Sequence, residues 1–242
     1  MNDAAGPGGA AWPVTLAYGR VSLRPIRRRD GRAWTEAHDR NTAWLQPWEA
    51  TVPPGGGSAR PPATFVEMVA DLRHQARAGR SLPWVVWYDP VDGVNPDRRH
   101  RVLAGQLTVS GITRGSAQWA QLGYWIDQRW AGRGIIPLAV ALATDYCLGR
   151  LGLHRIEIVI RPENHNSRRV VEKLGFRGEG LRPGYLHIDG EWRDHLVYAL
   201  HAEELGAGGL VGALAAQGRL ARLEFGAARA DSGDTPDQVT ER

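Results

Sequence analysis

Cysteine is nearly absent from this sequence of 242 residues, which contains one, Cys147. A single cysteine excludes an intramolecular disulfide and a metal site built from several thiolates. Its apolar neighbours predict a small buried side chain and not a catalytic thiol. The histidines and acidic residues show no HExxH or comparable spacing of metal ligands, so we expect no metal.

Long hydrophobic runs are missing as well. The longest apolar stretch, Ile135 to Ala143, is far shorter than the roughly 20 residues that cross a bilayer. The amino-terminal stretch lacks the apolar segment of a signal peptide. We therefore expect a cytoplasmic protein without a membrane partner.

Lysine is as scarce as cysteine, since Lys173 is the only one although the net charge is +4. Arginine thus carries nearly all of the positive charge, and its planar guanidinium suits phosphate and carboxylate ligands. The arginines are dispersed, and no basic helix or aromatic RNA-binding motif is present. These features favour small anionic ligands over DNA and leave contact with ribosomal RNA as a secondary expectation.

Hydrophobic periodicity predicts one α+β domain over residues 14–200, with elements in the order β-α-α-β-β-β-α-β-α-β-β. Residues 201–225 read as a helical extension. Small and polar residues dominate 1–13 and 226–242, which predicts disordered tails. Within the domain, Asp30 is expected to cap the first helix, and the β-branched stretch HRIEIVI is expected to form a central strand.

The segment QRWAGRG, ahead of an apolar helix, predicts a site for phosphate. Gly132 and Gly134 allow backbone N–H groups to approach a ligand, and the helix adds its positive dipole end. A P-loop is excluded because no GxxxxGK[ST] occurs, and a dinucleotide fingerprint fails because Pro137 replaces its third glycine. A glycine-rich turn without a ligand remains the alternative.

The pattern Arg129-x-x-Gly132-x-Gly134 resembles the acyl-CoA pyrophosphate loop of the GNAT acetyltransferase superfamily. The segments LGYWIDQRWAGRG, LHRIEIVIRPENHNSRRVVEKLGFRGEG and YLHIDGEWRDH follow one another as in the ribosomal-protein N-acetyltransferases called RimJ and RimL. The resemblance extends over roughly residues 15 to 200. It implies a GNAT fold, in which helices flank a mixed, mostly antiparallel central sheet, and acetyl-CoA as the acyl donor.

The resemblance also implies a set of cofactor contacts. The backbone near Ile126 would meet the pantetheine arm, while Asn164 and Ser167 would face the cofactor near the sulfur. Asn164 can equally cap the helix that begins there. The pyrophosphate would be wrapped by the backbone of Arg129, Ala131, Gly132, Arg133 and Gly134.

Three acid and base positions that are familiar in this superfamily hold other residues here, namely Gln121, Val171 and Leu186. An α-amine with a pKa of about 7.7–8.0 is on the order of 10–15 % neutral at pH 7, whereas a lysine is neutral to well under 0.1 %. The missing carboxylate base therefore favours an α-amine as acceptor. We expect its proton to leave through water held by Ser167, with Tyr185 or His187 nearest the reaction.

The stretch NTAWLQPWE, expected as a loop, contains the remaining candidates. The resemblance implies that this loop walls the peptide groove and that Glu49 meets the α-ammonium of the substrate, with Trp48 and Gln121 also on the acceptor side. Alternatively, the tryptophans only cover the core.

These features predict an acetyl-CoA-dependent N-acetyltransferase acting on the N-terminus of a protein, with a ribosomal protein, on the ribosome, as the implied target. Two alternatives stay open: acetylation of a small amine such as an antibiotic or polyamine, and an acyl-CoA-binding module without turnover. A homodimer is also left open.

Overall fold

The computed structural model describes residues 12–55, 62–91 and 100–224, and within them eight strands form one sheet in the order β1-β2-β3-β4-β5-β6-β8-β7. The β5–β6 pair is parallel and all other neighbours are antiparallel, so the predicted mixed, mostly antiparallel sheet is confirmed. The strands are β1 (Leu16–Tyr18), β2 (Val21–Pro25), β3 (Leu82–Tyr88), β4 (Val102–Thr113), β5 (Trp119–Ile126), β6 (Arg155–Ile160), β7 (Arg177–Ile188) and β8 (Glu191–His201).

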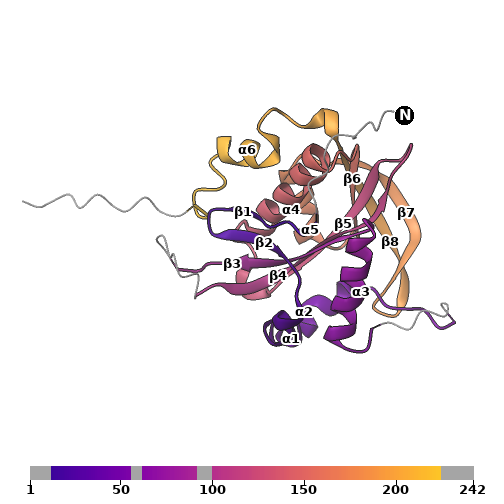
Figure 1. Ribbon diagram of the computed structural model, residues 1–242. Coiled ribbons are helices and arrows are strands. Elements are labelled where there is room, and N and C mark those ends of the chain that lie inside the picture. The colour runs from indigo at the N-terminus through magenta and orange to yellow at the C-terminus, as the bar shows by residue number, and fades with distance from the viewer. Residues whose placement is uncertain (1–11, 56–61, 92–99, 225–242) are drawn as a thin grey trace, which may run out of the picture.

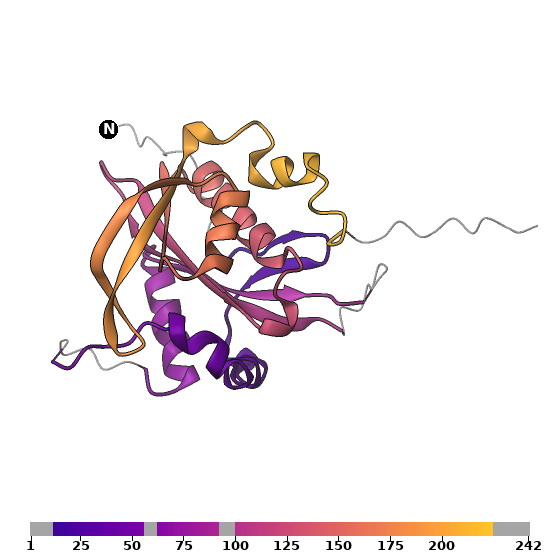
Figure 2. The same cartoon turned by 180° about the vertical axis from the view of Figure 1, so that it is seen from behind.

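Helices cover both faces of this sheet. Figure 1 shows α1, α2 and α3 on one face and α4, α5 and α6 on the other, and Figure 2 shows the same layers from behind. A large apolar core lies under α4 to α6, and a smaller one lies under α1 and α3. The helices are α1 (Gly31–Arg40), α2 (Thr42–Leu45), α3 (Phe65–Arg77), α4 (Ile135–Asp145), α5 (His165–Lys173) and α6 (Gly209–Ala216).

The stretch HRIEIVI forms β6 and is an inner strand, as predicted. It pairs with β5 on one side and with β8 on the other. Ile156, Ile158 and Ile160 are buried, which accounts for the β-branched composition. No described helix combines the length and the apolar character needed to cross a bilayer.

The first predicted strand is divided into β1 and β2 by a turn at Gly19, which has a φ of +50°. A Cβ on Gly19 would lie 2.1 Å from the carbonyl oxygen of Leu223, and that oxygen accepts a hydrogen bond from Arg20 N at 2.7 Å. Glycine is required because the carboxyl-terminal segment packs directly on this turn.

The carboxyl-terminal extension is less helical than its sequence indicates. Regular helix is confined to α6, and the following turns place Leu220 and Leu223 in the main core. The expected tails lie largely outside the described residues. Trp12, which falls in the first of them, stacks edge-on against Trp84 with ring centroids 5.2 Å apart.

Two local expectations at α1 and α2 need correction. Asp30 precedes α1 but its carboxylate does not cap it, because Arg24 and the backbone N–H of Arg27 hold that carboxylate in the preceding 3-10 turn. The expected loop NTAWLQPWE contains the short helix α2 and a 3-10 turn at Gln46–Trp48. Leu45 anchors this segment by being buried.

Candidate functional site

The sheet opens between its two parallel strands. Strand β5 pairs with β6 only at Trp119, Ala120 and Gln121, whereas its pairing with β4 continues to Ile126. Beyond Gln121, no strand of the described ranges pairs with the edge of β5 that faces β6. Backbone groups on that edge can therefore pair with an extended ligand as a further strand would.

The predicted phosphate turn follows directly after β5. A 3-10 turn at Gln128–Trp130 leads into Gly132 and Gly134, whose φ angles of +74° and +83° are left-handed. Within the described parts of the chain, the backbone N–H groups of Gly132, Arg133, Gly134 and Ile135 have no acceptor. The turn thus presents free donors beside the amino-terminal end of α4, as an anion site requires.

The carboxylate of Asp127 holds this turn in place. It is fully buried, and its carboxylate accepts hydrogen bonds from Arg40 at 3.0 Å and from Arg129 Nη2 at 2.8 Å. Burial pushes the pKa of Asp127 upward, but the hydrogen bonds from Arg129, Asn41 and Arg40 outweigh it and hold the pKa at about 2. The Arg129 side chain is therefore engaged, and what Arg129 can offer a ligand is its backbone.

Replacing Asp127 with asparagine should loosen the turn. Because the arginine partners are partly exposed, we expect Asp127→Asn to lower the free energy of unfolding by about 1–2 kcal/mol at pH 7. The folded-state pKa lies below the ordinary 3.8, so this contribution is complete above about pH 4 and is lost as the pH falls toward 2. Urea unfolding of both proteins at several pH values measures the difference, which should shrink in that interval; a difference that stays constant would contradict the assignment.

A cavity of about 270 Å³ runs from the open edge of β5 along the turn to α5. Arg169 and Lys173, one helical turn apart, bring positive charge to it, and the buried indole N–H of Trp130 has no acceptor among the described residues. Apart from these residues, the described lining consists of Trp44, Leu45, Trp48, Tyr124, Trp125, Ile126, Ala131, Gly132, Gly134, Ile135, Ile136, Pro137, Asn164, Asn166, Ser167 and Val170. An extended ligand that ends in phosphates fits this shape and charge.

Asn164 is the cap of α5, because its Oδ1 accepts the backbone N–H of Ser167 at 3.0 Å. Tyr124 donates its hydroxyl to the carbonyl of Ser167 at 3.4 Å, and burial raises the pKa of this tyrosine. Tyr124 is therefore neutral, and its one hydroxyl proton is directed at the Ser167 carbonyl. The structural role foreseen for Asn164 is confirmed, and both Asn164 and Ser167 also line the cavity.

A second cavity, of about 290 Å³, adjoins the first. It shares Leu45, Trp48, Tyr124 and Trp125 with the first cavity. The other described lining residues are Glu49, Ala50, Gln106, Thr108, Ser110 and Gly123. Two substrates placed in the two cavities would meet at β5.

Trp48 and Glu49 are held from several sides. The guanidinium of Arg161 lies 5.4 Å from the centre of the Trp48 ring and donates to the carbonyl of Pro47 at 2.7 Å. Oε1 of Glu49 is 2.6 Å from Nε2 of His38. Trp48 lines both cavities and Glu49 lines the second, so the segment is more than a cover for the core.

Residues 49–51, called the strap below, connect this wall to the tip of the β7–β8 hairpin. Ala50 forms an antiparallel bridge with Ile188, Thr51 N donates to the carbonyl of His187 at 2.9 Å, and Asp189 N donates to the carbonyl of Glu49 at 3.0 Å. The strap therefore extends the sheet locally and fixes one border of the second cavity.

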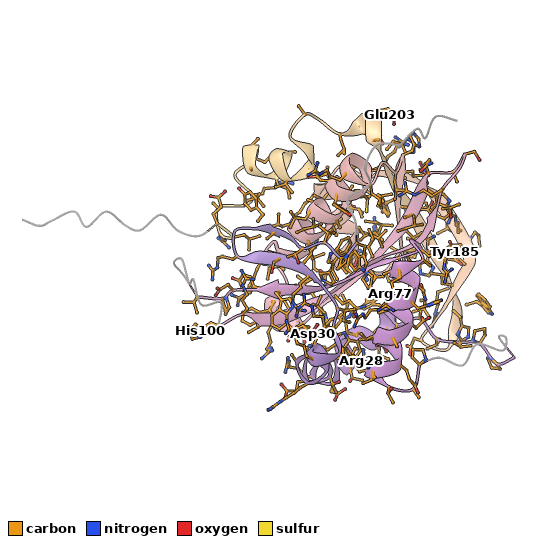
Figure 3. The ribbon with its side chains drawn as sticks, in the orientation of Figure 1. Arg28, Asp30, Arg77, His100, Tyr185 and Glu203 are labelled. Atoms are coloured by element: carbon orange, nitrogen blue, oxygen red, sulfur yellow. The ribbon has the colours of Figure 1, made fainter. Side chains whose placement is uncertain are left out.

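The structure separates the three residues expected to catalyse. Ser167 lines the first cavity, whereas neither Tyr185 nor His187 is among the described lining residues of either one. The Tyr185 hydroxyl accepts a hydrogen bond from Gln121 at 2.9 Å, and His187 Nδ1 lies 2.7 Å from the Thr51 hydroxyl of the strap. Figure 3 shows Tyr185 at the β7 side of the molecule, away from Arg28 and Asp30 beside α1.

Gln121, expected on the acceptor side, lies where β5 and β6 diverge. It donates to the buried carboxylate of Glu157 at 3.2 Å as well as to Tyr185. Arg182 and Arg155 pair with the same carboxylate at 2.8 and 3.0 Å. None of these residues is among the described lining of either cavity.

Sequence reasoning missed His38, Gln106, Asp127 and Glu157. Asp127 alone carried a local signal, since it stands immediately between the strand and the glycine turn. The other three acquire their places only when β4, β6 and α1 are assembled.

One group of metal-ligating side chains exists among the described residues, outside both cavities. Ligand atoms of His154, His201 and Glu203 lie within 4.8 Å of one another. His201 Nε2 already accepts a hydrogen bond from Arg155 at 3.0 Å. A cation there would face this guanidinium, which weakens the case for a metal site.

Comparisons with known proteins identify a family of acetyltransferases. Residues 20–177 match the family described as "Acetyltransferase (GNAT) domain". The "[Ribosomal protein uS5]-alanine N-acetyltransferase" of Escherichia coli K12 is 31% identical over 192 residues, which cover 77% of this chain and 90% of that protein.

Solved structures lead to the same family. Mycobacterium smegmatis RimJ in complex with CoA-disulfide is 37% identical, with a TM-score of 0.74, and the alignment covers 86% of this chain and 96% of that one. Ribosomal-protein-S5-alanine acetyltransferase from Vibrio fischeri is 26% identical, with a TM-score of 0.65 and coverage of 79% and 98%. The chain therefore belongs to the GNAT acetyltransferase family.

Proposed function

We propose that this protein transfers the acetyl group of acetyl-CoA to the N-terminal α-amine of a ribosomal protein. The observation that carries the proposal is the pair of cavities that share one wall of β5, one of them ending in a glycine turn with free N–H donors. The named activities of the Escherichia coli and Vibrio fischeri relatives support this class of acceptor. A ribosomal-protein acceptor would place the reaction in the cytoplasm.

The residues present fit acetyl-CoA. The backbone from Arg129 to Gly134 would hold the pyrophosphate, and Arg169 and Lys173 in the cavity lining would supply positive charge beside it. The Arg133 guanidinium, which lies over the Trp130 ring at 5.0 Å, would add to that charge. The open edge of β5 up to Ile126 would pair with the amides of the pantetheine arm, and Ser167 would lie near its end. When bound, the thioester supplies the activated acyl carbon, and the protein orients it toward the second cavity.

The acceptor would enter through the second cavity. Trp48 and Trp125 offer apolar walls for a small first side chain, and Glu49 offers a negative charge for the α-ammonium. Gln106, Thr108 and Ser110 place further polar groups along β4, where peptide amides can bond. We retain Gln121 as a polar group at the base of the opening.

The test compares acceptors in one assay of thiol release from acetyl-CoA, with the product identified by mass spectrometry. Peptides that begin with Ala or Ser should be acetylated on the α-amine. The same peptides with a blocked N-terminus and an internal lysine should react at less than about one hundredth of that rate, because so little of the lysine is neutral at pH 7. Transfer confined to polyamines or other small amines would overturn the proposal, as would tight binding of acetyl-CoA without thiol release.

A further inference from the structure

We propose that Glu49, positioned by His38, takes the proton from the acceptor ammonium as the amine attacks the thioester. Glu49 would be the catalytic base and His38 a positioning residue that acts through it. The inference rests on the proposed function, because it assumes that the amine enters through the second cavity.

His38 is held in a defined orientation by aromatic rings. Its imidazole stacks on Trp34, with ring centroids 4.7 Å apart and an interplanar angle of 9°, and meets Trp125 edge-on at 6.0 Å. Trp34 is fixed in turn, because its indole N–H donates to Gln106 Oε1 at 2.7 Å. The imidazole therefore has little freedom, and its Nε2 points at the carboxylate of Glu49.

This contact orients Glu49 without using its full capacity. Nε2 of His38 lies 2.6 Å from Oε1 of Glu49, while Oε2 has no partner among the described residues. A carboxylate accepts on both oxygens, so Oε2 stays available to an ammonium group. The backbone of Glu49 is held by the hairpin through Asp189, which keeps the side chain at the border of the cavity.

Glu49 is exposed toward the second cavity, and the two buried carboxylates near the opening are unsuitable as bases. Both oxygens of Glu157 are engaged by arginines and Gln121. Both oxygens of Asp127 bind arginine, and its pKa of about 2 makes it a weak proton acceptor. Among the described residues that line the two cavities, Glu49 is the one carboxylate.

The proposed step balances as follows. One proton of the α-ammonium moves to Glu49, and the neutral nitrogen attacks the acyl carbon of acetyl-CoA. The C–N bond forms, the C–S bond breaks, and a second proton of the nitrogen ends on the sulfur of CoA. Glu49 returns its proton to water, so each cycle releases one proton along with the acetylated peptide and CoA. A general base of this kind contributes roughly 10²–10⁴-fold to the rate.

The decisive variant is Glu49→Gln, assayed with an alanine-initial peptide. At pH 7 we expect kcat to fall about 100-fold, with the KM for acetyl-CoA unchanged. At pH 9 water deprotonates the α-amine, so the kcat of Glu49→Gln should be less than about tenfold below that of the wild type. His38, Arg161 and Asp189 are charged or titratable groups on the elements that contact residues 48–50. Glu49→Gln leaves all three in place, so the variant and the wild type share their effect on the pH profile.

His38 is tested by a graded pair. His38→Ala should lower kcat about tenfold and leave the KM for acetyl-CoA unchanged, whereas His38→Gln, which retains an N–H donor, should recover part of the loss. The control is the His154–Glu203 pair, whose atoms are 3.1 Å apart and lie outside both cavities. His154→Gln and Glu203→Gln should leave kcat and both KM values unchanged.

Thermal unfolding and binding of CoA to each variant show whether it is folded. An unchanged kcat in Glu49→Gln, or a rise in the peptide KM alone at every pH, would overturn the base assignment. Failure of the proposed function has a different signature, since the wild-type protein would then not acetylate any N-terminal peptide. If the wild type accepts a small amine instead, the same variants assayed with that amine still decide the role of Glu49.

Discussion

Gly105→Ala is expected to lower the free energy of unfolding by on the order of 3 kcal/mol and to weaken acetyl-CoA binding as well. A Cβ on Gly105 would lie 2.1 Å from the carbonyl oxygen of Trp125, which is backbone and cannot turn aside. Residue 105 pairs with Ile126, and the neighbouring Ala104 carbonyl accepts Asp127 N at 2.7 Å. One methyl group would therefore push β4 away from the strand and turn that hold the cofactor.

Thermal unfolding and the KM for acetyl-CoA measure the two effects of Gly105→Ala. A loss of about 3 kcal/mol corresponds to a fall in Tm of roughly 10 °C in a protein of this size. Gly178→Ala on β7 is the matched control, because a Cβ there meets only the Tyr198 ring at 3.8 Å. If Gly105→Ala melts like this control and retains its KM, the close approach of the two strands is not structurally important.

Gly132→Val is expected to raise the KM for acetyl-CoA about 30-fold while the peptide KM changes less than about threefold. Gly132 has a φ of +74°, which a β-branched residue adopts only at a cost of roughly 1–3 kcal/mol. The position of its Cβ is open space, so the folded protein has room for the side chain. That side chain would stand beside the N–H groups proposed to hold the pyrophosphate.

Gly115→Val separates strain from binding. Gly115 lies between β4 and β5, has a φ of +72° and likewise has open space around a Cβ. It should lose similar stability with no change in either KM. A peptide KM that rises more than that of acetyl-CoA in Gly132→Val would mean that the turn does not hold the cofactor.

The phosphate turn was predictable because its signal is local. Two glycines at a strand-to-helix junction state both the backbone conformation and the exposed N–H groups. Trp48 and Glu49 were identified on the resemblance, and the structure puts them at the cavities. The GNAT fold was also predictable from the resemblance, because the motifs of the family occur in order along most of the chain.

The parts that could not be predicted depend on residues distant in sequence. Asp127 meets Arg40 across 87 positions, and Gly105 is required only because β5 approaches β4 so closely there. The orientation of side chains on the β7–β8 hairpin could not be predicted for a further reason. A register shift between Arg182 and Leu186 interrupts the alternation of faces that places side chains on a regular strand.

The strap is joined to the hairpin mainly through its backbone. The bridge between Ala50 and Ile188 and the hydrogen bonds of Thr51 N and Asp189 N do not depend on which side chains occupy those positions. The side chains on either side of Glu49, at positions 48 and 50, can therefore change during evolution while this border of the acceptor cavity stays in place. The fold separates holding the acceptor cavity together from choosing the acceptor, which makes a change of substrate accessible through a few substitutions.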